Sequence, residues 1–373
     1  MFNSNYLLII ATSARYLAFS ATINGFKPLV IDIFADVDTQ NYSFEYQQIK
    51  SLALENLIPA VDYFIKRYQV KQCLYGSGFE NFIESLYYLD KHFVLLGNSP
   101  ATFQAVQNKQ AFFNLLIKLN INHPKTYFTA PDNSNNYLIK PFVNQGGVGV
   151  SYYTNQQNIN AFYWQELQAG LNHSVLFLAN GDEFQVIGFN TQWTINLGTG
   201  HEFIFSGIIN YARLTPQHKN LIIDWLKKLV PALKLIGLNS LDFIVDNQQC
   251  YCLEINPRIP ASVQLYDNSL LIAHINGSLH YKQSTENYQA YQIIYAPRDI
   301  IIPDTIDWTG YVDIPQVGSD CRAGQPICSM IASSSAAKST LAQLKQQQHT
   351  LFSQLFRGSS WQTQQASINY PNI

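Results

Sequence analysis

The 373-residue sequence predicts an α/β protein that begins with a doubly wound parallel sheet and continues into an antiparallel sheet. Three observations support this fold class. Short apolar runs alternate with helical segments over the first hundred residues, as in parallel sheets covered by helices. A glycine-rich stretch, "NQGGVGV", follows. Further strands end in "LDFIVDNQQCYCLEINPR", which is typical of a β-hairpin.

Composition narrows the class of protein. Hydrophobic residues make up 47% of the chain, charged residues 13%, and the formal net charge is −2, as expected for a globular protein with an ample core. The chain has no basic field that would favour nucleic acid or an anionic membrane. Its five cysteines lack C-x-x-C spacing, and the N-terminal apolar run is too short to span a bilayer. We therefore expect free thiols and a cytoplasmic location.

The N-terminal region is expected to alternate strand and helix. The expected strands are 6–11, "KPLVIDIF" (27–34), "QCLYGSG" (72–78) and "FVLLGNSP" (93–100), and the expected helices are 14–23, 59–68 and 79–89. Gly25 stands just after the first helix, where a C-terminal cap belongs. Ligands of such sheets bind beyond the carboxyl ends of the strands, where residues 13–15, Asp32 and residues 76–78 fall.

The rest of the chain gives the following expectations. A helix starts at Ser99-Pro100 and continues through "ATFQAVQNKQAFFNLLIKLNI". After it come a short strand in "NNYLIKPF", a strand pair in 164–189, a long amphipathic helix at 214–235, short strands in 313–332 and a helix at 336–356. The last fifteen residues, rich in Gln, Ser and Asn, are expected to be disordered.

The hairpin holds a conflict of charge. If its loop is 247–249, with Asp246 as a turn former, Asp242 lies directly across the ladder from Glu254. Opposed side chains have Cβ atoms about 5 Å apart, where like charges repel. Two facing carboxylates on a dry sheet are costly unless a cation lies between them. A hard divalent ion bound through oxygen would remove the conflict.

The same strand brings an amide and a guanidinium to the acid. With a two-residue period, Glu254, Asn256 and Arg258 share one face, while Leu253 and Ile255 point to the other. A purely structural pair of Asp242 and Glu254, bridged by Arg258 alone, is the alternative interpretation.

The glycine-rich loop offers backbone N–H groups to phosphate oxygens. Gly146, Gly147 and Gly149 permit a close approach, although such a turn also occurs as a plain hairpin connection. No Gly-Lys-Ser/Thr follows, which argues against a P-loop. Lys140, six residues upstream at the end of an apolar strand, can place a charge on the phosphates that the loop covers.

The order and spacing of Lys109, "LIKP", "NQGGVGV", "WQELQAG", "LDFIVD" and "LEINPR" resemble the ATP-grasp superfamily of carboxylate–amine and carboxylate–thiol ligases. The resemblance covers roughly residues 1–279. It implies the ATP-grasp fold, with an N-terminal α/β domain (1–98), a glycine-loop lid subdomain (99–190) and a metal-binding subdomain (191–285). Residues 286–373 would form a small C-terminal extension.

The resemblance also implies roles for particular residues. The nucleotide phosphates would be bound by Lys109 and Lys140 and covered by a lid loop of Gly146, Gly147 and Gly149. Adenine would be read through backbone groups of Gln165, Glu166 and Leu167. The ion, Mg²⁺ or Mn²⁺, would be held by Asp242, Glu254 and Asn256, and the acyl phosphate or acceptor carboxylate would be steadied by Arg258. The family often holds the ribose hydroxyls with an acid after the hinge. This chain has none there, so Asn172 or His173 is the expected substitute.

Some residues admit a second interpretation. Lys109 could be a solvated helix residue, and Glu166 a surface strand residue. Arg15 and Arg213 could each bind a substrate carboxylate through two parallel hydrogen bonds, or pair with a neighbouring acid.

The implied activity is amide formation through an acyl phosphate, with ATP and small-molecule carboxylate and amine substrates. "TSAR", "IDIFADVDT" and "PQVGSDCRAGQPICS" resemble a branch associated with methanopterin- or methanofuran-type one-carbon cofactor synthesis, which implies ligation of an amino acid such as glutamate. The alternatives are a carboxyphosphate-forming carboxylase or kinase on the same fold, and a non-catalytic ATP-binding sensor or scaffold. A homodimer is also possible.

Overall fold

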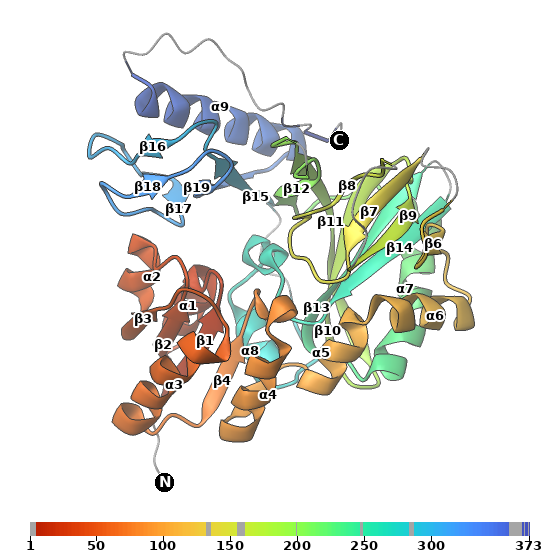
Figure 1. The fold of residues 1–373 in the computed structure, drawn as a ribbon, viewed down its shortest axis with the longest axis horizontal. Coiled ribbons are helices and arrows are strands. Elements are labelled where there is room, and N and C mark those ends of the chain that lie inside the picture. Colours follow the sequence, from red (N-terminus) through yellow and green to blue (C-terminus); the bar gives the residue numbers. More distant parts are fainter. Residues whose placement is uncertain are drawn as a thin grey trace.

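The computed structural model describes residues 5–131, 136–154, 161–198, 200–246, 249–282, 287–357, 368, 370, 371 and 373. A five-stranded parallel sheet near the N-terminus faces a larger, eight-stranded sheet, and a small four-stranded sheet lies beside the larger one (Figure 1). The last fifteen residues, expected to be disordered, lie almost entirely outside the described residues, as do Asn247 and Gln248 of the hairpin turn.

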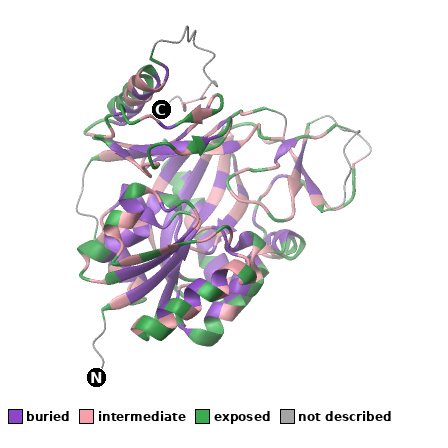
Figure 2. Cartoon of the chain, turned by 60° about the vertical axis from the view of Figure 1, so that its left-hand side comes forward, coloured by how far each residue is buried: buried purple, intermediate pink, exposed green. Residues whose placement is uncertain are grey.

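The N-terminal sheet has the order β3-β2-β1-β4-β5, with every pairing parallel. Its strands are β1 (Tyr6–Ala11), β2 (Lys27–Asp32), β3 (Glu45–Gln48), β4 (Gln72–Tyr75) and β5 (Val94–Leu96). The helices are α1 (Arg15–Ile23), α2 (Val37–Tyr42), α3 (Leu54–Tyr68), the 3-10 helix η1 (Phe79–Asn81) and α4 (Ile83–His92). The inner strands are buried on both faces, as Figure 2 shows, because helices cover both sides. The expected doubly wound sheet is confirmed.

Two features of this region differ from expectation. Helix α2 and strand β3 were not expected, because β3 is a short, half-exposed edge strand without an apolar run. Helix α3 begins at Leu54, whereas the sequence suggested a start at Pro59. Proline favours the first helical position, but here tertiary packing of Leu57 and Val61 keeps the proline within the helix.

A helix break places one of the predicted site residues. The single helix expected after Ser99 is two helices, α5 (Pro100–Gln107) and α6 (Lys109–Lys118). The side chain of Asn108 accepts a hydrogen bond from the Ala111 N–H at 3.1 Å and so caps a new helix. Lys109 therefore occupies the first position of α6, next to a bend.

The small sheet carries the lid. Its strand order is β6-β9-β7-β8, all antiparallel. The strands are β6 (Thr126–Tyr127), β7 (Tyr137–Pro141), β8 (Ser151–Tyr152) and β9 (Phe162–Glu166). The glycine-rich loop connects β7 to β8, so Lys140 at the end of β7 lies directly before the lid.

The large sheet is antiparallel throughout, in the order β14-β13-β10-β11-β12-β15-β19-β17. Its strands are β10 (Leu171–Asn180), β11 (Phe184–Ile195), β12 (Ile204–Ile209), β13 (Ile236–Asp246), β14 (Gln249–Asn256), β15 (Tyr288–Tyr295), β17 (Tyr311–Val312) and β19 (Pro326–Ser334). Strands from the C-terminal extension thus continue the central sheet. A separate pair is formed by β16 (Ile300–Ile301) and β18 (Asp320–Cys321).

Helices bury the faces of this sheet. Helix α7 (Pro216–Leu233) packs Trp225 and Leu229 against Phe243 of β13, and α9 (Ala337–Leu355) packs on β15 and β19. The 3-10 helix η2 (Ala261–Leu265) and helix α8 (Ser269–Ile275) follow β14. Among the described residues, none of the helices combines the length and apolar character needed to cross a bilayer.

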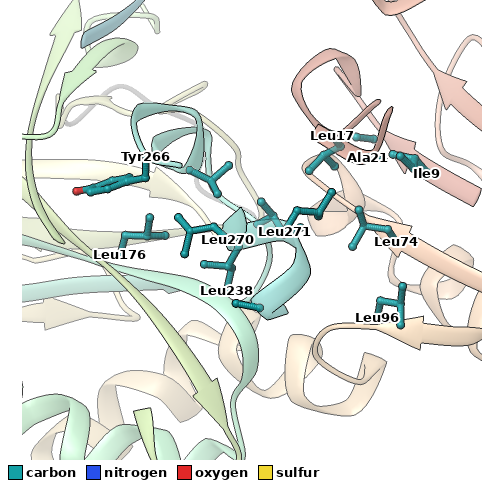
Figure 3. Close-up of a cluster of buried hydrophobic side chains, with 14 of the residues drawn as sticks. Ile9, Leu17, Ala21, Leu74, Leu96, Leu176, Leu238, Tyr266, Leu270 and Leu271 are labelled. Atoms are coloured by element: carbon teal, nitrogen blue, oxygen red, sulfur yellow. The ribbon is translucent and has the colours of Figure 1, made fainter. Parts of the chain in front are cut away.

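Helix α8 joins the two large sheets through a shared apolar cluster. Leu270 and Leu271 of α8 lie between Leu74 of β4 and Leu238 of β13 (Figure 3). All four side chains are buried. This continuous core fixes the N-terminal sheet against the strands that carry the predicted site.

Candidate active site

The hairpin of β13 and β14 brings its two acids together. Asp242 pairs directly with Glu254 in the antiparallel ladder, as the sequence predicted. The route differs from the expected one. Asp246 pairs with Gln249, so the connection is two residues long, and a β-bulge next to Asp242 then shifts the register by one. The two differences cancel at the acids.

The bulge also changes which side chains face the site. Phe243 pairs with Cys252 while Asp242 pairs with Glu254, so Leu253 is the extra residue of β14. Leu253 and Glu254 both line the cleft, whereas Ile255 is buried in the core. The prediction that Leu253 points away from the site is wrong, because a bulge interrupts strict two-residue alternation.

A large cleft of about 1670 Å³ lies between the N-terminal sheet, the lid sheet and the central sheet. Of the predicted site residues, those that line it are Arg15, Lys140, Gly146, Gly147, Gly149, Gln165, Glu166, Leu167, Asn172, His173, Asp242, Glu254, Asn256 and Arg258. Lys109 lies behind this wall and reaches the site through Glu254. Arg213 is exposed and is not part of the lining, so the geometry gives its substrate role no support.

Asp242 accepts two weak amide contacts. Asn256 Nδ2 lies 3.1 Å from its Oδ2, and Gln192 Nε2 lies 3.3 Å from its Oδ1. Burial, followed by the charge of Glu254, raises the pKa of Asp242 to about 7. These two amides do not fully compensate the negative charge.

Glu254 is held in the charged state by cations. Lys109 Nζ donates to Glu254 Oε2 at 3.0 Å, and the lysine side chain is only 4% exposed. Burial by itself would raise the pKa of Glu254, but Lys109, then Lys140 and Arg258, hold it below its ordinary value. The interpretation of Lys109 as a solvated residue is wrong, since its ammonium is buried on the carboxylate.

Lys140 stands next to the same acid with a weaker partner. Its Nζ donates to Gln165 Oε1 at 2.7 Å, and Gln165 Nε2 in turn donates to Thr126 Oγ1 at 3.1 Å. Burial lowers the pKa of Lys140 to about 8, although Glu254 acts in the opposite direction. A half-buried lysine that forms no ion pair with a carboxylate among the described residues is suited to an incoming phosphate.

The predicted adenine hinge has little free backbone N–H. Glu166 N–H donates to Lys125 O at 2.8 Å, and Leu167 N–H donates to Asn136 O at 2.7 Å. Both amides therefore hold the lid sheet together. Adenine recognition would have to use other backbone groups of this stretch or an opening of these bonds.

The glycine loop is folded down on the central sheet. Gly146, Gly147 and Gly149 have φ of +61°, +81° and +77°, a region in which side chains are strained. A Cβ on Gly147 would lie 2.0 Å from Phe203 O. Phe205 N–H donates to Gly146 O at 2.9 Å, so the loop is bonded to the entry of β12.

Arg258 is shared between two parts of the chain. Its Nε donates to Glu80 Oε1 at 2.6 Å, and Nη2 lies 3.4 Å from Asn256 Oδ1. The alternative interpretation, in which Arg258 alone bridges the two acids, is therefore not what the geometry shows. Glu80, which also accepts from Gly78 N–H at 2.9 Å, was missed by sequence reasoning. The sequence offered one clue to Glu80, which is an acid within "GSGFEN" at the end of an expected parallel strand.

Arg15 is paired with an acid of the C-terminal extension. Its Nε donates to Asp313 Oδ1 at 2.8 Å, and Nη2 donates to Gln264 Oε1 at 2.6 Å. Asp38 binds the N–H groups of Asp313 and Ile314, both at 2.9 Å. Of the two interpretations left open for Arg15, the ion pair is the one that the geometry shows.

Asn172 and His173, the residues considered for the ribose, both line the cleft on β10. The Nδ1 atom of His173 lies 3.3 Å from Asn190 O and 3.2 Å from Thr191 Oγ1. Burial lowers the pKa of His173 to about 4, so the ring is neutral near pH 7. The ring of His173 is only 2% exposed and packs on Phe243 of the apolar core, with ring centroids 5.6 Å apart, so Asn172 is the better placed of the two for a ribose hydroxyl.

The acidic cluster suits a hard divalent cation. Asp242, Glu254 and Asn256 offer oxygen donors from one face of a two-stranded ladder, which is the donor type that Mg²⁺ and Mn²⁺ prefer. Burial and the charge of Glu254 raise the pKa of Asp242, and a cation bound between the two acids would oppose both effects. The residues present therefore fit such an ion.

Comparison with known proteins agrees with this arrangement. Residues 106–262 match the model of the ATP-grasp domain family. These residues run from the end of α5, through Lys109, Lys140 and the glycine loop, to the start of η2 beyond Arg258. This part of the chain, less than half of its length, is therefore similar to the ATP-grasp domain family.

The curated relatives are parts of much longer proteins. The chain is 26% identical over 203 residues to the carbamoyl phosphate synthase large chain of Methanoculleus marisnigri, covering 47% of this chain and 19% of that protein. It is 24% identical over 197 residues to the corresponding chain of Lachnoclostridium phytofermentans, covering 45% and 18%. The chain therefore spans about a fifth of the length of these relatives.

Solved structures show the same fold over most of the chain. N5-carboxyaminoimidazole synthetase from Staphylococcus aureus, complexed with ADP, has a TM-score of 0.65 at 15% identity and covers 91% of this chain and 96% of its own. An L-amino acid ligase from Bacillus licheniformis has a TM-score of 0.67 at 14% identity, covering 94% and 97%. Biotin carboxylase from Campylobacter jejuni has 0.67 at 13%, covering 93% and 91%. The ATP-grasp fold expected from the sequence is confirmed.

Proposed function

We propose that this protein is an ATP-dependent carboxylate–amine ligase that forms an amide through an acyl phosphate and releases ADP and phosphate. One observation carries the proposal: Asp242 and Glu254 lie side by side on paired strands, at the wall of a cleft that Lys140 and Arg258 also line. Placing like charges side by side at a cleft wall is costly, which indicates that the cleft binds a charged ligand.

The first task of the site is to bind the nucleotide. Lys140 supplies positive charge at the cleft wall and would hold the phosphates in line with the acceptor, while Lys109 supplies its charge from behind Glu254. The glycine loop, already bonded to β12 at Gly146, would cover those phosphates and exclude water. Asn172 is the group that would meet the ribose.

Asp242, Glu254 and Asn256 would hold the divalent cation. When bound, this ion supplies charge neutralisation to the triphosphate. It would also relieve the repulsion of the two acids. Within the protein, the cations that lower the pKa of Glu254 are Lys109, Lys140 and Arg258.

The chemistry needs no side-chain nucleophile. A carboxylate oxygen of the acid attacks the γ-phosphorus of ATP, the bond from that phosphorus to the bridging oxygen breaks, and ADP leaves. The amine nitrogen then attacks the acyl carbon, phosphate leaves, and the amine proton passes to solvent or phosphate. Arg258, fixed by Glu80, would stabilise the negative charge on the acyl phosphate.

For the substrates, we propose an amino acid such as glutamate and an acid of the methanopterin or methanofuran type. This rests on the resemblance of "TSAR", "IDIFADVDT" and "PQVGSDCRAGQPICS" alone. We also place the protein in the cytoplasm, in keeping with five free cysteines that are all buried. The domain boundaries and the homodimer remain predictions.

A second candidate function is a carboxyphosphate-forming carboxylase. The neighbouring structures favour it, since they include N5-carboxyaminoimidazole synthetase and biotin carboxylase. In that case bicarbonate would replace the organic acid as the group that attacks ATP.

The test is ADP release from MgATP with a panel of amino acids, pterin- and furan-type acids, and bicarbonate. Release that depends on one organic acid and yields an amide supports the ligase. Release that depends on bicarbonate supports the carboxylase. Tight ATP binding without ADP release in any mixture contradicts both and favours a nucleotide sensor.

A further inference from the structure

A buried seam joins β5 of the N-terminal sheet to β13 of the central sheet. Asn98, 1% exposed, follows β5 and lies at its centre. Its Oδ1 accepts from Ile236 N–H at 2.7 Å, and its Nδ2 donates to Asn239 Oδ1 at 2.7 Å. Asn239 is itself fixed by donating to Gly237 O at 2.9 Å.

The same amide of Asn98 reaches the active-site corner. Its Nδ2 also donates to the carbonyl oxygen of Pro257 at 3.0 Å. Tyr75 Oη donates to Asn98 O at 2.7 Å and lies 3.4 Å from the same Pro257 oxygen. A residue of the N-terminal sheet thus holds the peptide group that joins Pro257 to Arg258.

The position of that peptide group matters because of its neighbours. Pro257 stands between Asn256 and Arg258, which both line the cleft. The proline ring fixes φ at this residue, so ψ is its remaining free backbone angle, and the direction of the carbonyl reports ψ. Holding the Pro257 oxygen therefore fixes how the chain leaves β14 and where the Arg258 side chain begins.

A second contact across the seam, made by His274, does not extend to Pro257. His274 of α8 accepts from Leu238 N–H at 2.8 Å through Nδ1, and its Nε2 lies 3.0 Å from Leu96 O. Because Nδ1 accepts from an amide, the ring proton is on Nε2 and faces that carbonyl. Leu96 and Leu238 flank α8 in Figure 3. His274 thus links β5 to β13 through two hydrogen bonds that do not involve Pro257.

We propose that Asn98, assisted by Tyr75, is a positioning residue that sets the Pro257–Arg258 corner for phosphoryl and acyl transfer. Its consequence for catalysis rests on the proposed ligase function. It acts through Arg258 and contacts neither substrate nor nucleotide. The nucleotide end of the cleft, with Lys109 and Lys140, does not depend on this contact.

The test compares Asn98→Ala with His274→Ala as a matched control, since each removes buried hydrogen bonds of the same seam. Hydrogen exchange followed by mass spectrometry is the first measurement. We expect faster exchange in the peptide covering 255–262 for Asn98→Ala and, less strongly, for Tyr75→Phe, but not for His274→Ala. Equal exchange in that peptide for Asn98→Ala and His274→Ala would overturn the positioning role.

The second measurement is turnover of MgATP with the acid that supports ADP release, assayed below the unfolding temperature of each variant. Asn98→Ala should lower kcat about tenfold relative to His274→Ala, with the Kd for MgADP within about twofold of the wild type. A parallel loss of kcat in both variants, or a matching loss of MgADP affinity, would overturn the inference. If the wild-type protein itself turns over no acid, the ligase proposal fails, while the exchange measurement still decides whether Asn98 holds the corner.

Discussion

The two ends of the cleft use charge in opposite ways. At the nucleotide end, Asp242 and Glu254 repel each other, and burial together with that repulsion raises the pKa of Asp242 to about 7. At the far end, Arg15 and Asp313 form a direct ion pair. Arg258 and Glu80, between the two, are likewise matched. In the first arrangement two carboxylates are placed opposite each other, whereas in the others a guanidinium is bonded directly to a carboxylate from a distant part of the chain.

The difference shows how to separate binding charges from structural ones. A paired, buried ion contributes to how elements dock, and removing one partner leaves an unpaired charge. A set of like charges at a cleft wall is retained although it is unfavourable in the free protein, which indicates a ligand of opposite charge. The predictions below follow this contrast, beginning with the largest expected effect.

Glu254→Gln should abolish turnover, lowering kcat about 10³-fold, because it removes one of the two acids proposed to hold the cation and one charge beside Lys109. The measurement is ADP release from MgATP, with circular dichroism to show that the fold persists. Glu80→Gln is the comparison, since it neutralises a buried acid that is paired with Arg258. If Glu254→Gln retained full activity, the proposed cation site would be wrong.

Gly147→Ala should lower kcat/KM for ATP about tenfold, because its Cβ would meet Phe203 O at 2.0 Å and push the loop off β12. Gly146→Ala is the matched control, with positive φ but no atom within 4 Å of the added Cβ. Equal effects of the two substitutions would show that the backbone angle matters and the bonded lid does not.

ATP affinity should fall as pH rises through about 8, where the half-buried Lys140 loses its proton in the free protein. Because the pKa is lowered from an ordinary value near 10.5, the loss begins well before exposed lysines titrate. The Kd for MgATP, measured by calorimetry from pH 7 to 9.5, should rise about tenfold per pH unit above this pKa. Lys140→Arg should bind with little dependence on pH over this range, and an equally steep rise in that variant would exclude Lys140 as the cause.

Asp313→Asn should have the smallest effect on nucleotide binding, with the Kd for MgADP within about twofold of the wild type. It should lower the free energy of unfolding by about 1–3 kcal/mol, because Arg15 loses its buried carboxylate. Thermal unfolding and calorimetry measure the two quantities. A large loss of MgADP affinity would instead place Asp313 within the nucleotide end.

The sequence was most informative where charged residues occur within apolar strand patterns. Asp242 and Glu254 stood out as acids on a strand pattern in a chain with few charges, and their pairing follows from the length of the hairpin even though a bulge compensates for a shorter turn. The parallel N-terminal sheet and the C-terminal helix were likewise visible as apolar periodicity.

The features that the sequence did not predict depend on contacts between residues that are far apart in the sequence. Glu80 lies 178 residues from Arg258 in sequence, and Asp313 lies 298 residues from Arg15, so no local pattern reports either pair. Asn98 was invisible for the same reason, because its partners are Asn239 and Pro257. The bent start of α6 at Lys109 was hidden in a continuous helical periodicity that the cap at Asn108 interrupts.

Calorimetric titration of ADP into the wild-type protein, with and without Mg²⁺, tests the central claim most directly. The account predicts that Mg²⁺ strengthens ADP binding at least about tenfold, and that Asp242→Asn removes most of this gain while retaining the metal-free affinity. Equal ADP affinity with and without Mg²⁺, or a full gain in Asp242→Asn, would contradict the claim that these facing acids exist to receive a metal–nucleotide complex.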